Sequence, residues 1–276
     1  MVIERGDLRP SALAGRWYPA EPAVLEAEVE RHLALASARS GGAPSSLAAV
    51  AFIVAPHAGI TYSGGTAAFA WAAAPAGVER IVLVGPAHRV AFRGVALGDY
   101  AAFQIPTGDV PVDRAALAAL ANQHPQLVAF VPGAHDAEHC LEIQLPFAQA
   151  LLQGVPIVPL LAGAVSTPEL TTVLDAVLRP RDLLVVSTDL SHFNPYADAR
   201  RRDLATLKSI AELDPFALSG EDACGYRGLG ASGMLARLRG YRAVVLDYTN
   251  SGDTGGDRDA VVGYGALAFG PPARSS

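Results

Sequence analysis

Three apolar runs along this chain each lead into a histidine, and this feature constrains the fold more than any other. The runs, with the polar residues that follow them, are 48–55 with His57, 80–85 with His88, and 182–187 with Asp189 and His192. Runs rich in Val, Ile and Leu are typical of strands buried on both faces of a sheet. Because the carboxyl ends of parallel strands meet at one edge, where ligands gather, we expect these side chains to form one cluster. Such a cluster indicates a metal site or acid–base chemistry.

Predicted strands and helices alternate throughout the 276-residue chain. This alternation predicts an α/β fold, with one layered domain over residues 1–276 around a mostly parallel central sheet. Neither a repeat nor a linker divides the sequence, and the tail after about residue 270 is expected to be flexible. Residues 242–248 and 259–269 predict two closing strands, which would add antiparallel pairs to the sheet.

Two helices are predicted close to the expected cluster. The Ala-rich residues 66–74 predict a helix for which Ser63 is a suitable N-cap. Residues 138–153 predict a second helix, on which His139 and Glu142, three positions apart, would share a face. This pair could be half of a metal site, a pair that supports one, or an ordinary surface pair.

The composition argues against several classes of partner. Charged residues make up 17% of the chain and its net charge is −6, which argues against nucleic acid or an anionic membrane surface as a partner. No apolar stretch is long enough to cross a membrane, and the first residues lack the pattern of a signal peptide. Two cysteines are too few for a disulfide framework. We therefore expect a cytoplasmic protein.

His57, His88 and Cys224 are the candidate metal ligands. Both histidines follow a proline at the end of a predicted strand, and the alternative for each is a turn histidine that hydrogen-bonds the backbone. The repetition of this arrangement favours ligands. Cys224 lies in a Gly-bounded turn, which suits a thiolate presented to a metal or a substrate. Cys140 lies in an apolar segment, so it is expected to be packed.

Asp189 and His192 are the candidate acid–base pair. A carboxylate beside an imidazole can orient the ring and raise its basicity. The alternative is a helix start at which Ser187 or Asp189 caps backbone N–H groups. Capping alone, however, would not explain three polar turns at three strand ends.

Six short motifs make the sequence resemble the Memo family, also called AmmeMemoRadiSam system protein B, over nearly the whole chain. Each motif is short, but six in order are jointly specific. They are Ala-Gly-Arg-Trp-Tyr-Pro at 14–19, Pro-His-Ala-Gly-Ile-Thr-Tyr-Ser-Gly at 56–64, Gly-Pro-Ala-His at 85–88, Glu-His-Cys-Leu-Glu-Ile-Gln-Leu-Pro-Phe at 138–147, Ser-Thr-Asp-Leu-Ser-His at 187–192, and Ala-Cys-Gly at 223–225.

The resemblance implies a fold similar to that of the class III extradiol dioxygenases, which are non-haem iron enzymes that cleave aromatic rings. Those enzymes bind iron through two histidines and a carboxylate. The resemblance therefore implies Fe(II) as the cofactor. Here a thiolate stands in place of the carboxylate, and this softer ligand shifts the affinity toward copper or zinc, which are the alternatives. The resemblance implies these roles: His57, His88 and Cys224 as metal ligands, Asp189 and His192 in the same pocket, and His139 and Glu142 nearby.

Three functions remain open, because one fold supports many chemistries. The first is redox or oxygenase-type chemistry on an unknown small substrate. The second is a non-catalytic role in binding a ligand or peptide, together with the radical-SAM and AMMECR-type partners that the family name records. The third is zinc-dependent hydrolysis, with Asp189 or His192 as the base.

Overall fold

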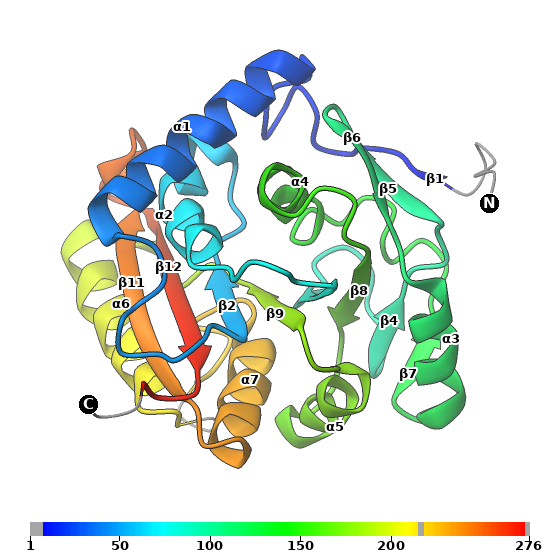
Figure 1. Cartoon of the computed structure of the whole chain (residues 1–276). Coiled ribbons are helices and arrows are strands. Elements are labelled where there is room, and N and C mark those ends of the chain that lie inside the picture. Colours follow the sequence, from blue (N-terminus) through cyan, green and yellow to red (C-terminus); the bar gives the residue numbers. More distant parts are fainter. Residues whose placement is uncertain (1–7, 215–217, 274–276) are drawn as a thin grey trace.

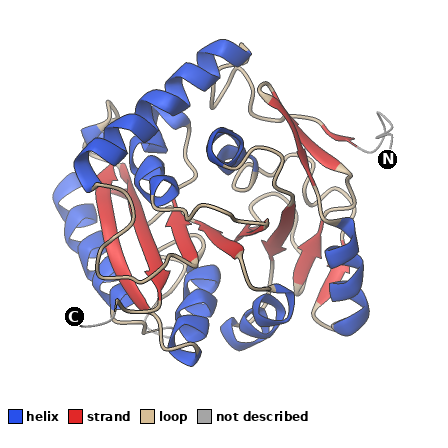
Figure 2. Cartoon of the chain, in the orientation of Figure 1, coloured by secondary structure: helices blue, strands red, loops and turns tan. Residues whose placement is uncertain are grey.

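The three apolar runs form adjacent strands in the middle of a mixed sheet. The computed structural model describes residues 8–214 and 218–273, and helices cover both faces of this sheet (Figure 1, Figure 2). The strands are β1 Leu8–Arg9, β2 Phe52–Ala55, β3 Arg80–Pro86, β4 Val95–Leu97, β5 Ala102–Ile105, β6 Gly108–Pro111, β7 Val128–Phe130, β8 Ile157–Ala162, β9 Asp182–Ser187, β10 His192–Asn194, β11 Arg242–Asn250 and β12 Val261–Gly270. The helices are α1 Pro22–Ser40, α2 Ile60–Ala72, α3 Arg114–Gln123, α4 Leu145–Leu151, α5 Thr167–Val177, α6 Tyr196–Ala211 and α7 Tyr226–Leu238.

The main sheet has the order β10-β12-β2-β9-β3-β8-β4-β7, and β11 pairs with β12. Strands β2, β9, β3 and β8 are mutually parallel, and all residues of β2 are buried. Strands β11 and β12 are antiparallel, as expected for the closing segments. The prediction of an α/β domain with a mostly parallel central sheet is confirmed. The sequence reasoning missed a small second sheet of order β1-β5-β6.

The helices pack in two layers around the sheet. Helices α1, α2 and α4 contact one another on one side, while α5, α6 and α7 are linked by their own contacts on the other (Figure 1). Gly228 allows α7 to approach β9, since a Cβ there would lie 3.1 Å from Cγ1 of Val186. Within the described residues, none of the helices is both long and apolar enough to cross a membrane.

The helix predicted over 138–153 is wrong in its first half. Residues 132–137 and 140–141 form turns joined by irregular backbone at 138–139, residues 142–144 form a single 3-10 turn, and α4 begins only at Leu145. Pro146 lies in the first turn of α4. Proline lacks an N–H, and its ring clashes with the carbonyl four residues earlier, so a helix that started at 138 could not pass through it without distortion.

The predicted N-cap of α2 is also wrong. Helix α2 begins at Ile60, with Gly59 as its N-cap. Ser63 therefore lies inside the helix, where its Oγ donates a hydrogen bond to the carbonyl of Ala58 at 2.9 Å.

The chain after β12 continues to pair with the rest of the protein. The backbone N–H of Ala48 donates to the carbonyl of Pro271 at 2.8 Å, and that of Ala273 donates to the carbonyl of Ser46 at 2.9 Å. The end of the tail that was expected to be flexible, residues 274–276, lies outside the described residues.

Candidate metal centre

Three neighbouring strands deliver polar side chains to one edge of the sheet. His57 follows β2, His88 follows β3, and Asp189 follows β9, which lies between these two strands. Because the three strands are parallel, their carboxyl ends meet. The rings of His57 and His88 are packed edge to face, with 5.2 Å between their centroids. The structure thus brings together three of the residues that the sequence singled out.

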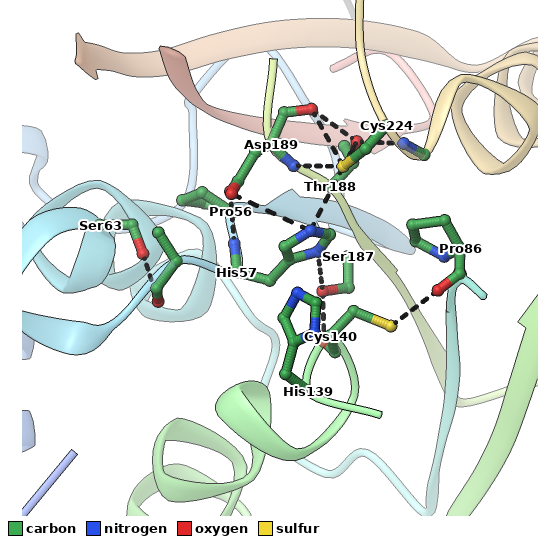
Figure 3. A network of polar contacts seen from close by, with 12 residues as sticks. Pro56, His57, Ser63, Pro86, His139, Cys140, Ser187, Thr188, Asp189 and Cys224 are labelled. Atoms are coloured by element: carbon green, nitrogen blue, oxygen red, sulfur yellow. Dashed lines mark hydrogen bonds and ion pairs between the residues drawn. The ribbon is translucent and has the colours of Figure 1, made fainter. Parts of the chain in front are cut away.

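His139 adds a third imidazole to this group. Its ring centroid lies 5.2 Å from that of His57 and 4.4 Å from that of His88. One nitrogen from each ring lies within 4.8 Å of the others, a spacing at which one metal ion could contact all three. His139 comes from the irregular segment that precedes α4, and it lies below the ring of His57 in Figure 3.

A chain of hydrogen bonds determines which nitrogen of His57 carries the proton. Trp71 Nε1 donates to Gln144 Oε1 at 2.9 Å, so Gln144 Nε2 is the atom that faces Ser187 Oγ at 3.0 Å. The hydroxyl of Ser187 has one hydrogen, which it donates to the carbonyl of Cys140 at 2.6 Å. Ser187 Oγ can therefore only accept from His57 Nδ1, 3.1 Å away. Neutral His57 is protonated on Nδ1, and its Nε2 has a free lone pair.

Glu138 holds His88 in the same way. Its Oε1 accepts a hydrogen bond from Nδ1 of His88 at 2.9 Å, and its Oε2 accepts from the backbone N–H of His88 at 2.6 Å. Oε1 also lies 3.1 Å from Nδ1 of His139. Burial by itself raises the pKa of Glu138, but the bonds from His139 and His88 outweigh it and hold this pKa well below its usual range. The carboxylate is therefore ionised, and His88 keeps Nε2 for another partner.

The pKa values of His88 and His139 are shifted in opposite directions. Burial lowers the pKa of His88, yet its hydrogen bonds with Cys224 and Glu138 outweigh burial and raise it overall. The pKa of His139 is lowered, first by burial and then by the neighbouring rings of His57 and His88. His139 is therefore neutral near pH 7, which is the form of imidazole that binds metals.

Cys224 approaches this group from the start of α7. Its Sγ lies 3.3 Å from His57 Nε2 and accepts the backbone N–H of Asp189 at 3.3 Å (Figure 3). The next residue, Gly225, makes this approach possible, because a Cβ there would lie only 2.6 Å from Cβ of Thr188. The turn is thus pressed onto the end of β9, with its sulfur facing His57.

Asp189 contacts His57 through both carboxylate oxygens. Its Oδ1 accepts the backbone N–H of His57 at 2.7 Å, and its Oδ2 lies 3.9 Å from Nε2 of the same residue. Among the described residues, the ring of His192 instead contacts that of Phe193, with 5.7 Å between their centroids. The structure thus places Asp189 against His57, while His192 lies on β10 with other partners.

Glu142 lies in a separate buried cluster. It pairs with Arg9 and accepts the hydroxyl hydrogen of Tyr18 at 2.6 Å. All of these side chains are shielded from solvent. The predicted pairing of His139 and Glu142 on one helix face therefore does not occur, because the backbone at 138–141 is not helical and the two side chains have different partners, Glu138 and Arg9.

The donors in this cluster fit a metal ion. Neutral His57 has an unprotonated Nε2, and Nδ1 of His139 is buried with the poorly aligned carboxylate of Glu138 3.1 Å away. A buried polar atom of this kind usually has a partner. Of the described residues, His57, His88 and His139 have donor atoms that all lie within 4.8 Å of one another, and Cys224 could join them through its sulfur, 3.3 Å from His57 Nε2. Imidazole and thiolate together suit iron, copper or zinc rather than magnesium or calcium.

A second group of potential ligands is less suitable. Donor atoms of His88, Glu138 and Cys140 also lie within 4.8 Å of one another. Complete burial raises the pKa of the Cys140 thiol well above its usual value, so this thiol does not ionise near neutral pH. Its Sγ instead donates to the carbonyl of Pro86 at 3.2 Å.

Comparison with known proteins identifies the family of this chain. The family model described as Memo-like protein matches residues 9–268. The chain belongs to the Memo family. Curated relatives named MEMO1 family protein include one from Aeropyrum pernix, 35% identical over 94% of this chain and 99% of the relative. Another, from Ignicoccus hospitalis, is 32% identical over 95% of this chain and 98% of the relative.

Sequence reasoning missed three residues of this Memo family cluster. Glu138 and Ser187 hold the rings of His88 and His57, and Gln144 in turn hydrogen-bonds Ser187, although none of the three was assigned to the site. The available signal was polar character within apolar surroundings, since all three lie in the motifs 138–147 and 187–192. Polar residues that are fully buried usually have specific hydrogen-bond partners.

Proposed function

We propose that this Memo family protein is a metal-dependent redox enzyme that holds one Fe(II) ion between His57, His88 and Cys224, with His139 as a further donor. One observation carries the proposal. Two imidazoles are each held at Nδ1 by a buried partner, and Nε2 of one of them, His57, lies 3.3 Å from the sulfur of Cys224. Metal-binding histidines usually donate their other N–H to such a partner, which fixes the ring and its tautomer.

The residues around the rings support oxygenase-type chemistry on a small substrate. A bound iron ion would supply open coordination positions and one-electron chemistry. Ser187 and Glu138 orient the rings of His57 and His88. The carboxylate of Asp189, 3.9 Å from His57 Nε2, is placed to accept a proton in the pocket. His192 is proposed as a second acid–base group.

The test is the metal content of protein purified without oxygen. We expect close to one equivalent of iron, and its loss in the variants Cys224→Ser and His57→Ala. His124→Ala is the matched control, because His124 caps the end of α3 and should leave the metal content unchanged. Wild-type protein that contains no metal, and does not bind added iron, copper or zinc, would refute the proposal and favour a non-catalytic binding protein.

Zinc-dependent hydrolysis is the second candidate, and the position of Asp189 favours it. A carboxylate beside a metal ligand can act as the base for a zinc-activated water. One equivalent of zinc, with no change in the absorption spectrum on oxidation or reduction, would support this function over the first. Action with radical-SAM and AMMECR-type partners, and a cytoplasmic location, stay predictions.

A further inference from the structure

The side chain of one arginine hydrogen-bonds the backbone of the segment that carries Glu138. Arg9 is fully buried. Its Nε donates to the carbonyl of His135 at 2.7 Å, and its Nη2 donates to the carbonyl of Glu138 at 2.7 Å. Its Nη1 pairs with the carboxylate of Glu142. One planar guanidinium therefore holds two backbone carbonyls of this segment and the side chain of Glu142, which follows it.

Glu142 completes the network from the other side. It accepts hydrogen bonds from the hydroxyl of Tyr18 at 2.6 Å and from Ser11 Oγ at 2.7 Å. Burial opposes its ionisation, but the charge and hydrogen bond of Arg9, together with the hydrogen bond from Tyr18, lower the pKa of Glu142 below its usual value. The segment around Arg9 and the turn before α4 thus form one hydrogen-bonded unit.

We propose that Arg9 is a positioning residue for the metal centre, an inference that rests on the proposed function. Glu138 connects the two parts. Its carbonyl accepts from Arg9, while its carboxylate contacts Nδ1 of both His88 and His139. Movement of this segment would take the Glu138 carboxylate away from the rings of His88 and His139 only if the buried hydrogen bonds between Arg9 and the backbone broke. Arg9 thereby acts, through Glu138, on the two rings that would contact the ion.

Stability alone does not account for this arrangement. A buried ion pair adds little net stability compared with apolar side chains of similar volume, because desolvation offsets the attraction of the charges. A guanidinium, however, offers several donors in a fixed plane. Two buried carbonyls in an irregular turn need such donors, since the turn provides no ladder of backbone hydrogen bonds.

The protein contains a matched control for Arg9. Arg80 is also buried, donates to the carbonyl of Val177 at 2.6 Å, and pairs with Asp182. It begins β3, whereas His88 follows the other end of that strand. Changes at Arg80 should therefore disturb stability to a similar extent without reaching the candidate metal centre.

The experiment compares two variants, each of which removes every charge of one buried ion-pair network so that no charge is left unpaired. They are Arg9→Met with Glu142→Gln, and Arg80→Met with both Asp113→Asn and Asp182→Asn. The affinity for Co²⁺ and the visible absorption spectrum of the Co²⁺ complex are measured at a temperature at which each variant is folded. We expect the first variant to lose affinity by about 10- to 100-fold, with a changed spectrum, and the second to change by less than about twofold.

A second readout needs no metal. The ¹⁵N–¹H NMR spectrum of the imidazoles in metal-free protein reports which nitrogen is protonated. In the wild type and the Arg80 variant we expect His88 to be protonated on Nδ1, because Nδ1 donates to Glu138. In the Arg9 variant we expect a mixture of the two tautomers.

The outcomes separate this inference from the proposed function. An Arg9 variant with a lower Tm, but with unchanged Co²⁺ affinity, spectrum and tautomer, would overturn the positioning role. If the wild type binds no Co²⁺, the proposed metal function fails, and the tautomer comparison alone decides whether Arg9 positions the ring of His88.

Discussion

Replacing Ser187 by alanine should affect both stability and metal binding. Ser187 is fully buried, and its hydroxyl bonds to His57 Nδ1, Gln144 Nε2 and the carbonyl of Cys140. Gln144 keeps a second acceptor, the carbonyl of Pro56, but His57 and Cys140 each lose this partner. A buried polar group left without a partner costs about 1–3 kcal/mol, so two such groups should lower the free energy of unfolding by ~3 kcal/mol after some relaxation.

Urea unfolding followed by tryptophan fluorescence measures this cost. Ser232→Ala is the matched control, because Ser232 is equally buried but donates only to the carbonyl of Leu229 within α7. We expect the control to lose less than about 1 kcal/mol. Metal affinity should fall about tenfold for Ser187→Ala, since His57 is then free to change its tautomer. Equal losses of stability for Ser187→Ala and Ser232→Ala would refute the reasoning from the hydrogen-bond network.

Three further changes test other parts of the structure. Burial lowers the pKa of His135 from 6.5 to about 4, so between these values the unfolded chain binds more protons than the folded protein. Stability should therefore fall by about 2 kcal/mol between pH 7 and pH 5, and His135→Gln should remove this part of the slope in urea titrations. An unchanged slope would contradict the buried neutral form. A Cβ at Gly85 would lie 2.6 Å from Cys140 Sγ, so Gly85→Ala should cost about 2 kcal/mol. Adding Cys140→Ala should recover part of the lost free energy of unfolding, because it removes the sulfur that the new Cβ would meet. If the effects of the two substitutions on this free energy simply add, the clash is not the cause. Gly225→Ala should displace the neighbouring Cys224 turn from Thr188 and reduce bound metal, measured by elemental analysis. Full metal occupancy in that variant would count against the close approach.

The central strands were predictable because their signal is local. The uninterrupted apolar runs form β2, β3 and β9, and these strands end close to the expected boundaries. Such runs are recognisable because a strand covered on both faces needs apolar side chains at every position. The position of His57 and His88 just beyond these strands followed directly from the order of residues. The start of α4 could also have been found, because Pro146 by itself excludes an undistorted helix from 138 onward.

Other parts of the site depend on contacts between distant segments. Arg9 and Glu138 are separated by 129 positions, and Trp71 and Gln144 by 73. No periodicity or spacing links such residues, because their hydrogen bonds form only after the layers have packed. The predicted pairing of Glu142 with His139 illustrates this. The actual partner of Glu142 is Arg9, which reaches it only because the fold brings the N-terminal segment beside residues 138–142.

The sequence by itself determined the fold class, the family and the edge of the sheet where two histidines and an aspartate gather, because apolar runs and strand-end motifs are properties of neighbouring residues. Only the tertiary structure decided that His139 joins them, which nitrogen of His57 stays free, and how Glu138 is held in place. The physical reason is that a buried polar group must find its partner wherever the packed chain brings one, and the order of residues alone does not reveal where that is.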